Sequence, residues 1–256
     1  MALDMSRLRK KLDKLSGNNA RSNAFWKPQE GRNVIRIVPW KDEPNWPFIE
    51  AYFHYIGGRT QLSPITHGNP DPIQELADEL RRDGSKDGWQ KAKPFMAKPR
   101  TYVPIIDRDD EASGVQFYSF GKTVLQTLLN YIEDPDIGDI TDIEDGFDLV
   151  INYTPREKSD TNFPKTDVHI RPKAVPLHDD QSLVKTWLNE QPDIWDILEE
   201  PSYDELTTFL EKFLGGDDEE EDDEFQSITE STTNSTDDSG APTSSTVEEF
   251  TELFNS

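Results

Sequence analysis

The sequence contains no cysteine and no long hydrophobic run. Without cysteine, disulfide bonds, thiolate metal sites and a cysteine nucleophile are all excluded. A membrane-spanning helix needs about 20 predominantly apolar residues, which no segment offers. The N-terminus also carries charges where a signal peptide would be apolar. We therefore expect a soluble, intracellular protein.

Basic residues are nearly missing from the last third of the chain. Residues 174–256 hold 24 acidic residues and only two basic ones, Lys185 and Lys212, whereas residues 1–173 hold 27 acidic and 25 basic residues. The formal net charge of -24 therefore arises almost entirely at the C-terminal end. Because the rest of the chain is close to neutral, it can carry a local positive groove, and a nucleic-acid partner is not excluded.

Recognisable catalytic motifs are also missing. The sequence has no phosphate-binding glycine loop, no nucleophile elbow and no HExxH motif. The four histidines are scattered along the chain at His54, His67, His169 and His178. A structural or surface role is more common for such histidines than metal ligation. We expect no enzymatic activity, no cofactor and no metal.

One stretch, residues 86–122, alternates basic residues with aromatic rings. The basic residues are Lys86, Lys91, Lys93, Lys98, Arg100 and Lys122, and the rings are Trp89, Phe95, Tyr102, Phe117, Tyr118 and Phe120. Residues 101–106 and 115–120 have strand composition and flank an acidic turn, so the pattern predicts a long hairpin. Such a sheet is typical of sequence-tolerant binding to single-stranded nucleic acid. The alternative is that the rings form core and the cations a solvated face.

Further patterns predict short strands with a few helices. Strands are expected at residues 33–38, 48–56, 147–153 and 166–171, and helices at 72–82, 122–132, 181–198 and 202–214. Arg36 lies between Ile35 and Ile37, so it points away from the core, towards an exposed groove or a solvated face. Residues 154–165 repeat the mixture of cations and rings. We predict a mainly β, α+β fold built on a small closed barrel with additions.

The two ends of the chain differ from its body. In residues 1–20, Leu8, Leu12 and Leu15 follow helical spacing among basic residues. This basic segment suits an acidic partner, a membrane surface or another copy of the protein. Residues 217–256 contain 14 acidic residues and no basic one, so they cannot build a core and are expected to be disordered.

The last ten residues, VEEFTELFNS, place apolar side chains at helical spacing between acids. Such a segment is typical of a short helix that folds on a partner. We assign partner binding to Phe250, Leu253 and Phe254. The alternative is that these are isolated apolar residues in a solubilising tail.

In the order of its features, the chain resembles the single-stranded DNA-binding proteins of T-even-type bacteriophages, in the version carried by their more distant relatives. The resemblance covers nearly the whole length. It rests on KLSG at residues 14–17, NVIRIVPWKDEPNWPF at 33–48, THG at 66–68, VQFYSFGK at 115–122 and the acidic tail with an apolar end.

The resemblance implies a five-stranded oligonucleotide-binding (OB) barrel with an inserted subdomain. The expected domains are a self-association arm at 1–20, a DNA-binding core at 21–216 with its insertion at 57–84, and a partner-binding tail at 217–256. The function implied is cooperative, sequence-independent binding of single-stranded DNA in viral replication, recombination and repair. The protein would act in the cytoplasm of the infected bacterium and recruit replication proteins through its tail.

The resemblance also implies residue roles. It assigns DNA contacts to Arg36, Lys98, Arg100, Tyr118 and Phe163. Composition adds Trp89, Lys91, Lys93, Tyr102 and Lys122. Contacts with a neighbouring copy fall on Arg7, Arg9, Lys10 and Lys11, although Leu8 interrupts the family's compact basic run.

The residues of this chain that match the family's zinc ligands cannot form a zinc site. The matching positions are His54, Ser63, Ile73 and Leu76, and only the histidine is a zinc ligand. We expect Ile73 and Leu76 to fill this place with a small apolar core. The rival interpretation of the whole chain is an acidic adaptor or DNA mimic that binds no single-stranded DNA.

Overall fold

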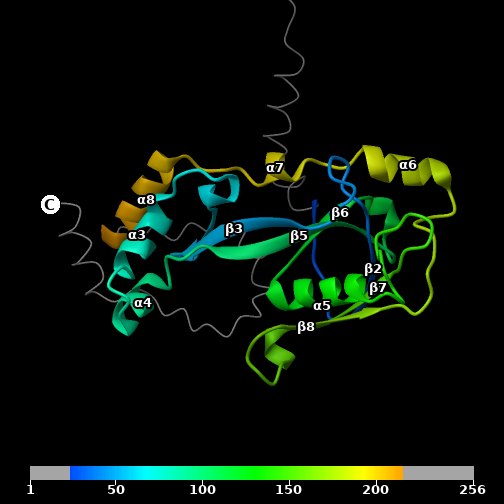
Figure 1. The fold of residues 1–256 in the computed structure, drawn as a ribbon, viewed down its shortest axis with the longest axis horizontal. Helices are drawn as coiled ribbons and strands as arrows, with labels where there is room; N and C mark the ends of the chain where they lie inside the picture. The colour runs from blue at the N-terminus through cyan, green and yellow to red at the C-terminus, as the bar shows by residue number, and fades with distance from the viewer. Residues whose placement is uncertain (1–23, 216–256) are drawn as a thin grey trace, which may run out of the picture. The chain divides into compact units, whose positions relative to one another are not determined.

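The computed structural model of the protein describes residues 24–215. Within this range the fold is mixed α+β, with one sheet of eight strands and six α helices (Figure 1). Contacts group the described chain into two compact units. Unit 1 comprises residues 24–49 and 101–197, and unit 2 comprises residues 50–100 and 198–215.

Unit 1 contains most of the sheet. Its strand order is β1-β6-β5-β2-β7-β8. The strands are β1 (Phe25–Trp26), β2 (Gly31–Ile37), β5 (Lys98–Asp107, of which residues 98–100 belong to unit 2), β6 (Gln116–Phe120), β7 (Leu149–Thr154) and β8 (Lys165–Ile170). β1 and β6 are parallel, and the other pairs along this path are antiparallel. The predicted hairpin is confirmed, since Val103 of β5 lies opposite Tyr118 of β6.

Both faces of this sheet are covered. On one face Ile35 and Ile37 pack with Val124 and Leu128 of α5 (Lys122–Glu133). A separate cluster joins Val38 and Ile106 to Leu177 and to the buried residues of α6 (Gln181–Asn189). The short helix α7 (Ile194–Ile197) follows after Pro192, and the 3-10 helices η2 (Glu111–Ser113) and η3 (Arg156–Lys158) lie in loops. A strand in the middle of this sheet therefore has no solvated face.

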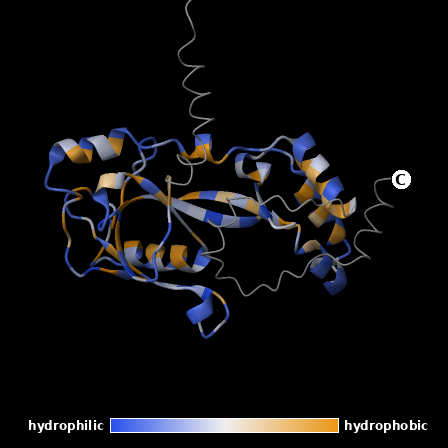
Figure 2. Cartoon of the chain, turned by 180° about the vertical axis from the view of Figure 1, so that it is seen from behind, coloured by the Kyte–Doolittle hydropathy of each residue, from blue (hydrophilic) through white to orange (hydrophobic). Residues whose placement is uncertain are grey.

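Unit 2 combines a hairpin with three helices. β3 (Ile49–Ile56) pairs with β4 (Arg59–Leu62) through a turn at Gly57 and Gly58, both with positive φ. The 3-10 helix η1 (Pro64–His67) leads to α3 (Pro72–Leu80) and α4 (Lys86–Ala92), and α8 (Tyr203–Gly215) returns from the C-terminal side. Figure 2 shows hydrophobic residues interleaved with hydrophilic ones along the helices, as expected for helices with one buried face.

The small apolar core of unit 2 contains Ile73 and Leu76, as expected from the sequence. They pack with Ala77 and Phe95 and with Leu206, Leu210 and Leu214 of α8. The contribution of α8 was not anticipated, because its residues lie more than 100 positions after α3. The mixed α+β class is thus confirmed, whereas the closed five-stranded barrel stays a prediction.

Candidate nucleic-acid interface

Helix α4 of unit 2 presents an exposed indole ring beside a cation. Ser85 caps the helix by accepting a hydrogen bond from the N–H of Gly88. Gly88 and Ala92 are buried, while Trp89 is 46% exposed. The Nζ atom of Lys93 lies 5.6 Å from the centre of the Trp89 ring, a cation–π arrangement. The exposed ring of Trp89 thus lies beside the partly buried cation of Lys93.

Gly88 allows α4 to lie close to α3. A Cβ atom at this position would overlap the carbonyl oxygen of Leu80 and lie 2.7 Å from Oδ1 of Asp83. Lys91 pairs with Asp87 at 3.2 Å on the same helix. Residues 86–92 therefore form a short helix before the hairpin, and close backbone packing fixes which of its faces carries Trp89.

The two other cations expected in unit 2 differ in exposure. Lys98 is partly buried and Arg100 is buried. Burial raises the pKa of Tyr55, and the positive charge of Arg100 opposes that rise, which places the guanidinium near the phenol. Arg100, assigned to DNA contact, is therefore not open to a single strand in this conformation, whereas Lys98 keeps some accessible surface.

Tyr102 and Tyr118 of the hairpin are core residues, with 0% and 1% exposure. Tyr118 meets Trp26 edge to face at 5.0 Å between ring centres, and Phe117, on the opposite face of β6, stacks on Trp40 at 5.3 Å. Phe117 and Tyr118 are both buried, although they lie on opposite faces of β6, because both faces of the sheet are covered. Neither tyrosine can stack on a base in this conformation.

Arg36 does not face an exposed groove, contrary to the expectation, because it is 0% exposed. Its Nη2 donates to the carbonyl oxygens of Asp142 at 2.7 Å and Val175 at 3.0 Å, and its Nη1 lies 3.8 Å from Oδ1 of Asp148. Burial lowers the pKa of Arg36 to about 10, although Asp148 opposes the shift. Through these hydrogen bonds, Arg36 holds the loops that contain Asp142 and Val175 against one face of β2, opposite the face that carries Ile35 and Ile37.

The loop between β7 and β8 presents the second exposed ring. Phe163 is 42% exposed and follows Asn162, whose φ is 58°. Arg156, at the start of η3, is exposed in the same loop. Two neighbouring lysines already have acidic partners: Lys158 lies 2.6 Å from Glu30, and Lys165 lies 3.0 Å from Asp167. The loop offers a ring and a guanidinium to a single strand, and Lys122 is also exposed, at the start of α5.

Sequence reasoning missed the exposed ring of Tyr203, which is 43% exposed and whose hydroxyl donates to Glu75. It also missed Trp46, which is 52% exposed. Trp46 lies in the proline-rich link before β3 and touches Phe48 edge to face at 5.5 Å. The available signal was a tryptophan outside any strand pattern and directly before a proline.

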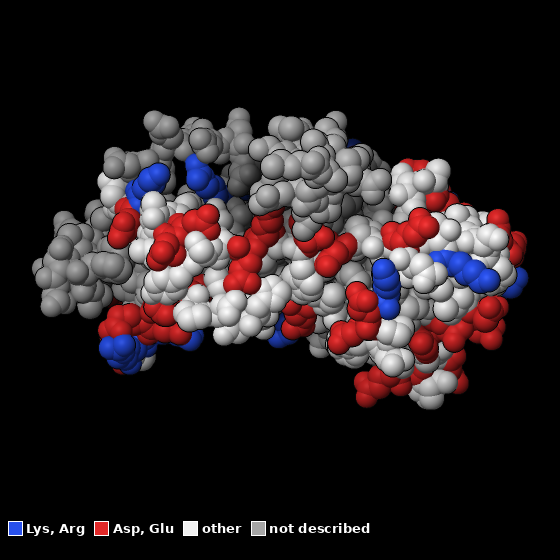
Figure 3. Space-filling model, turned by 90° about the horizontal axis from the view of Figure 1, so that it is seen from above, with Lys and Arg blue, Asp and Glu red and all other residues white. Residues whose placement is uncertain are grey.

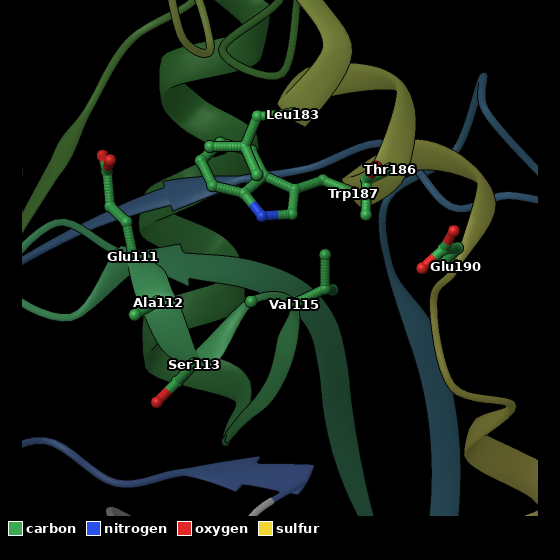
Figure 4. Close-up of a pocket in the computed structure, with 9 residues that line it drawn as sticks. Glu111, Ala112, Ser113, Val115, Leu183, Thr186, Trp187 and Glu190 are labelled. Atoms are coloured by element: carbon green, nitrogen blue, oxygen red, sulfur yellow. The ribbon is translucent and has the colours of Figure 1, made fainter. Parts of the chain in front are cut away.

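Acidic side chains outnumber basic ones on one face of the described protein (Figure 3). Figure 3 shows a face on which acidic side chains are spread widely and basic ones form a few separate spots. A pocket of about 440 Å³ lies in unit 1 between η2 and α6. Figure 4 shows Trp187, Leu183 and Val115 in its middle, with Glu111 and Glu190 at either side. Its lining contains carboxylates and no basic residue, so it does not suit a phosphate.

The residues assigned to self-association (Arg7, Arg9, Lys10, Lys11) and to partner binding (Phe250, Leu253, Phe254) lie outside the described residues. Among residues 24–215, no helix is long and apolar enough to cross a membrane, and no three histidine or acidic side chains are grouped as a metal site.

The chain was also compared with known proteins. The family model "gp32 DNA binding protein like" matches residues 29–214, which is more than half of the chain and nearly all of its described part. None of the curated proteins compared with the chain matches it. The matched range includes the elements of both units that carry Trp89 and Phe163.

Proposed function

The chain belongs to the gp32 DNA binding protein-like family, and from this premise we propose that it binds single-stranded DNA cooperatively and without sequence preference. Family membership supports single-strand binding in general, and the match over residues 29–214 is the observation that carries the proposal. The protein would act in viral DNA replication, recombination and repair, in the cytoplasm of an infected bacterium, as a binding protein rather than an enzyme.

Each unit contributes an exposed ring and a cation to this proposal, and in unit 1 the two share one loop. In unit 2 these are Trp89 and Lys93, and in unit 1 they are Phe163 and Arg156. A ring that stacks on a base contributes about 1–3 kcal/mol, and every base has a face on which to stack. Cations that neutralise phosphates add affinity that falls with salt. Contacts of these kinds hold a single strand without reading its base edges.

Several finer parts of the proposal derive from the resemblance. The sheet of unit 1 would form the OB barrel of the family. The basic arm, with Arg7, Arg9, Lys10 and Lys11, would contact the neighbouring copy along DNA. The acidic tail, with Phe250, Leu253 and Phe254, would recruit replication proteins and compete with DNA for the basic residues. Opposite charge supports the last assignment, because residues 217–256 carry 14 acidic residues and no basic one.

The second candidate is an acidic adaptor or DNA mimic that binds no single-stranded DNA. The spread of acidic side chains over the face in Figure 3 favours it. It is the weaker candidate because surface acidity does not explain the exposed ring of Trp89 with Lys93 beside it. Its distinguishing property is the lack of binding at any ionic strength.

Quenching of tryptophan fluorescence by a single-stranded oligonucleotide tests the proposal. The full chain has six tryptophans, and Trp89 and Trp46 are exposed. We expect saturable quenching with an affinity that falls steeply as salt rises. Oligonucleotides of different sequence should give similar affinities. An absence of quenching and of any other binding signal at low salt would instead support the adaptor.

A further inference from the structure

Three segments of unit 2 meet at one buried carboxylate, that of Asp71, which is 2% exposed. Its Oδ2 lies 2.9 Å from Nε2 of His54 and accepts a hydrogen bond from the hydroxyl of Ser63. Its Oδ1 accepts from the backbone N–H groups of Ile73 at 2.9 Å and Gln74 at 3.1 Å. We call His54, Ser63 and Asp71 the Asp71 cluster.

The members of the cluster come from separate elements. His54 lies on β3, Ser63 lies between β4 and η1, and Asp71 is the N-cap residue of α3. His54 and Ser63 are fully buried. One carboxylate therefore connects the hairpin, the 3-10 turn and the first helix. It accepts more hydrogen bonds than helix capping alone requires.

The surroundings keep this carboxylate ionised. Burial by itself raises the pKa of Asp71, but the hydrogen bonds from His54, Ser63 and Gln74 and the charge on His54 bring it below its ordinary value. An ionised carboxylate only accepts hydrogen bonds, so Nε2 of His54 is the donor. Charge-assisted hydrogen bonds of this kind are stronger than neutral ones.

The zinc ion implied by the family resemblance does not fit these side chains. The positions that match the family's ligands hold His54, Ser63, Ile73 and Leu76. Ile73 and Leu76 have no donor atoms, and both belong to the apolar core with α8. The hydroxyl of Ser63 and Nε2 of His54 are both directed at Asp71. A tetrahedral site needs four nitrogen, sulfur or oxygen ligands, and these residues do not provide them.

We propose that the Asp71 carboxylate is the metal-free cross-link of unit 2, and that it holds together the segments which a zinc ion would join in the family. Asp71 acts as a positioning residue. It fixes the start of α3, the helix against which α4 packs at Leu80 and Gly88. The orientation of α4, and with it the exposure of Trp89, depends on this cross-link. The folding of unit 2 is then independent of zinc and of cysteine oxidation.

A pair of matched substitutions separates the cross-link from helix capping. Asp180 caps α6 as Asp71 caps α3, by accepting from the backbone N–H of Ser182, but it is exposed. Among the described residues, no histidine ring or serine hydroxyl donates to its carboxylate, and only its backbone N–H bonds the ring of His178. Serine is a good N-cap residue but is too short to reach His54 and Ser63. Asp71→Ser therefore removes the cross-link and keeps a cap, and Asp180→Ser is its control. Ser63→Ala removes a single hydrogen bond and remains informative if Asp71→Ser does not fold.

The test is hydrogen exchange of the full-length protein, with melting and metal analysis as further measurements, and it requires no DNA binding. We expect Asp71→Ser to speed exchange in residues 50–100 by about tenfold or more and to lower the melting temperature by about 10 °C. Ser63→Ala should shift both in the same direction by less. Asp180→Ser should leave residues 50–100 unchanged. A zinc chelator should not affect the wild type, and purified protein should contain no stoichiometric zinc.

Two results would overturn the proposal. One is stoichiometric zinc in the purified protein, or faster exchange in residues 50–100 when a chelator is added. The other is exchange in residues 50–100 that is the same in Asp71→Ser or Ser63→Ala as in the wild type. Neither outcome bears on single-strand binding, so the proposed function is tested separately.

Discussion

At the scale of single residues, the burial of a side chain separates structural cations from available ones. Arg36 lies fully inside unit 1, where it donates to the carbonyl oxygens of Asp142 and Val175. Arg156 is exposed in the loop between β7 and β8. Arg36 lies within β2 and Arg156 closely follows β7, but only Arg156 can reach a phosphate without unfolding its surroundings.

Replacing Arg36 should therefore affect stability and not DNA affinity. We expect Arg36→Ala to lower the free energy of unfolding by about 3–5 kcal/mol, because it leaves two buried carbonyl oxygens and part of the Asp148 carboxylate without their partner. Chemical denaturation measures this loss, and an oligonucleotide titration under folding conditions measures affinity. Arg156→Ala is the control and should change stability by less than about 0.5 kcal/mol. A stable Arg36→Ala protein with weakened DNA binding would contradict the burial argument.

Trp89 should behave in the opposite way. We expect Trp89→Ala to weaken single-strand binding by about 1–3 kcal/mol, or about 5- to 150-fold, because it removes a stacking ring. Its partial exposure should keep the loss of stability small. Anisotropy of a labelled oligonucleotide measures the affinity, and Trp89→Phe should restore much of it. Wild-type affinity in Trp89→Ala would exclude stacking at this ring.

At the scale of elements, the period of a sequence pattern identifies a strand but does not show what covers its faces. The alternation in residues 33–38 correctly predicted β2 and correctly separated Arg36 from Ile35 and Ile37. The face of Arg36 is covered by the loops that contain Asp142 and Val175, and these have no periodic pattern of their own. A sequence pattern does not show which strand faces are covered, and for this reason the sequence did not distinguish the buried ring of Tyr102 from the exposed ring of Trp89. The exposure of Phe163 agreed with expectation because its loop is bounded by polar residues on both sides.

Helix α4 provides a test at this scale. Gly88→Ala should destabilise unit 2 by about 1–3 kcal/mol, because the added Cβ overlaps the backbone of Leu80 and forces α4 away from α3. Gly215→Ala is the matched control, since nothing lies within 4 Å of its added Cβ. Hydrogen exchange in residues 72–92 reports the effect. Equal exchange in both variants would mean that the contact of α4 with α3 is not tight.

At the scale of the whole molecule, segments far apart in the sequence build each unit. Unit 2 takes Leu206, Leu210 and Leu214 from α8, and these pack with Ile73 and Leu76. The helical spacing of these leucines predicted a helix, but spacing does not indicate which distant surface a helix covers. The acidic tail begins directly after this helix, so eight consecutive acids, residues 217–224, follow the last described element. A boundary in composition thus lies directly after the last described helix.

The separation of charge along the chain leads to a prediction for the tail. Removal of residues 217–256 takes away 14 acidic residues and no basic residue. If the tail competes with DNA for Lys93 and for exposed cations such as Arg156, the truncated protein should bind a single strand more tightly, on the order of tenfold at low salt. The gain should shrink as salt rises, because screening weakens the tail and the DNA alike. Titrations of the full chain and of residues 1–216 at several salt concentrations measure the gain in affinity and its salt dependence. A full-length variant with serine in place of each acid of the tail is the control for excluded volume. Equal affinity of the full and truncated chains at low salt would show that the tail does not compete.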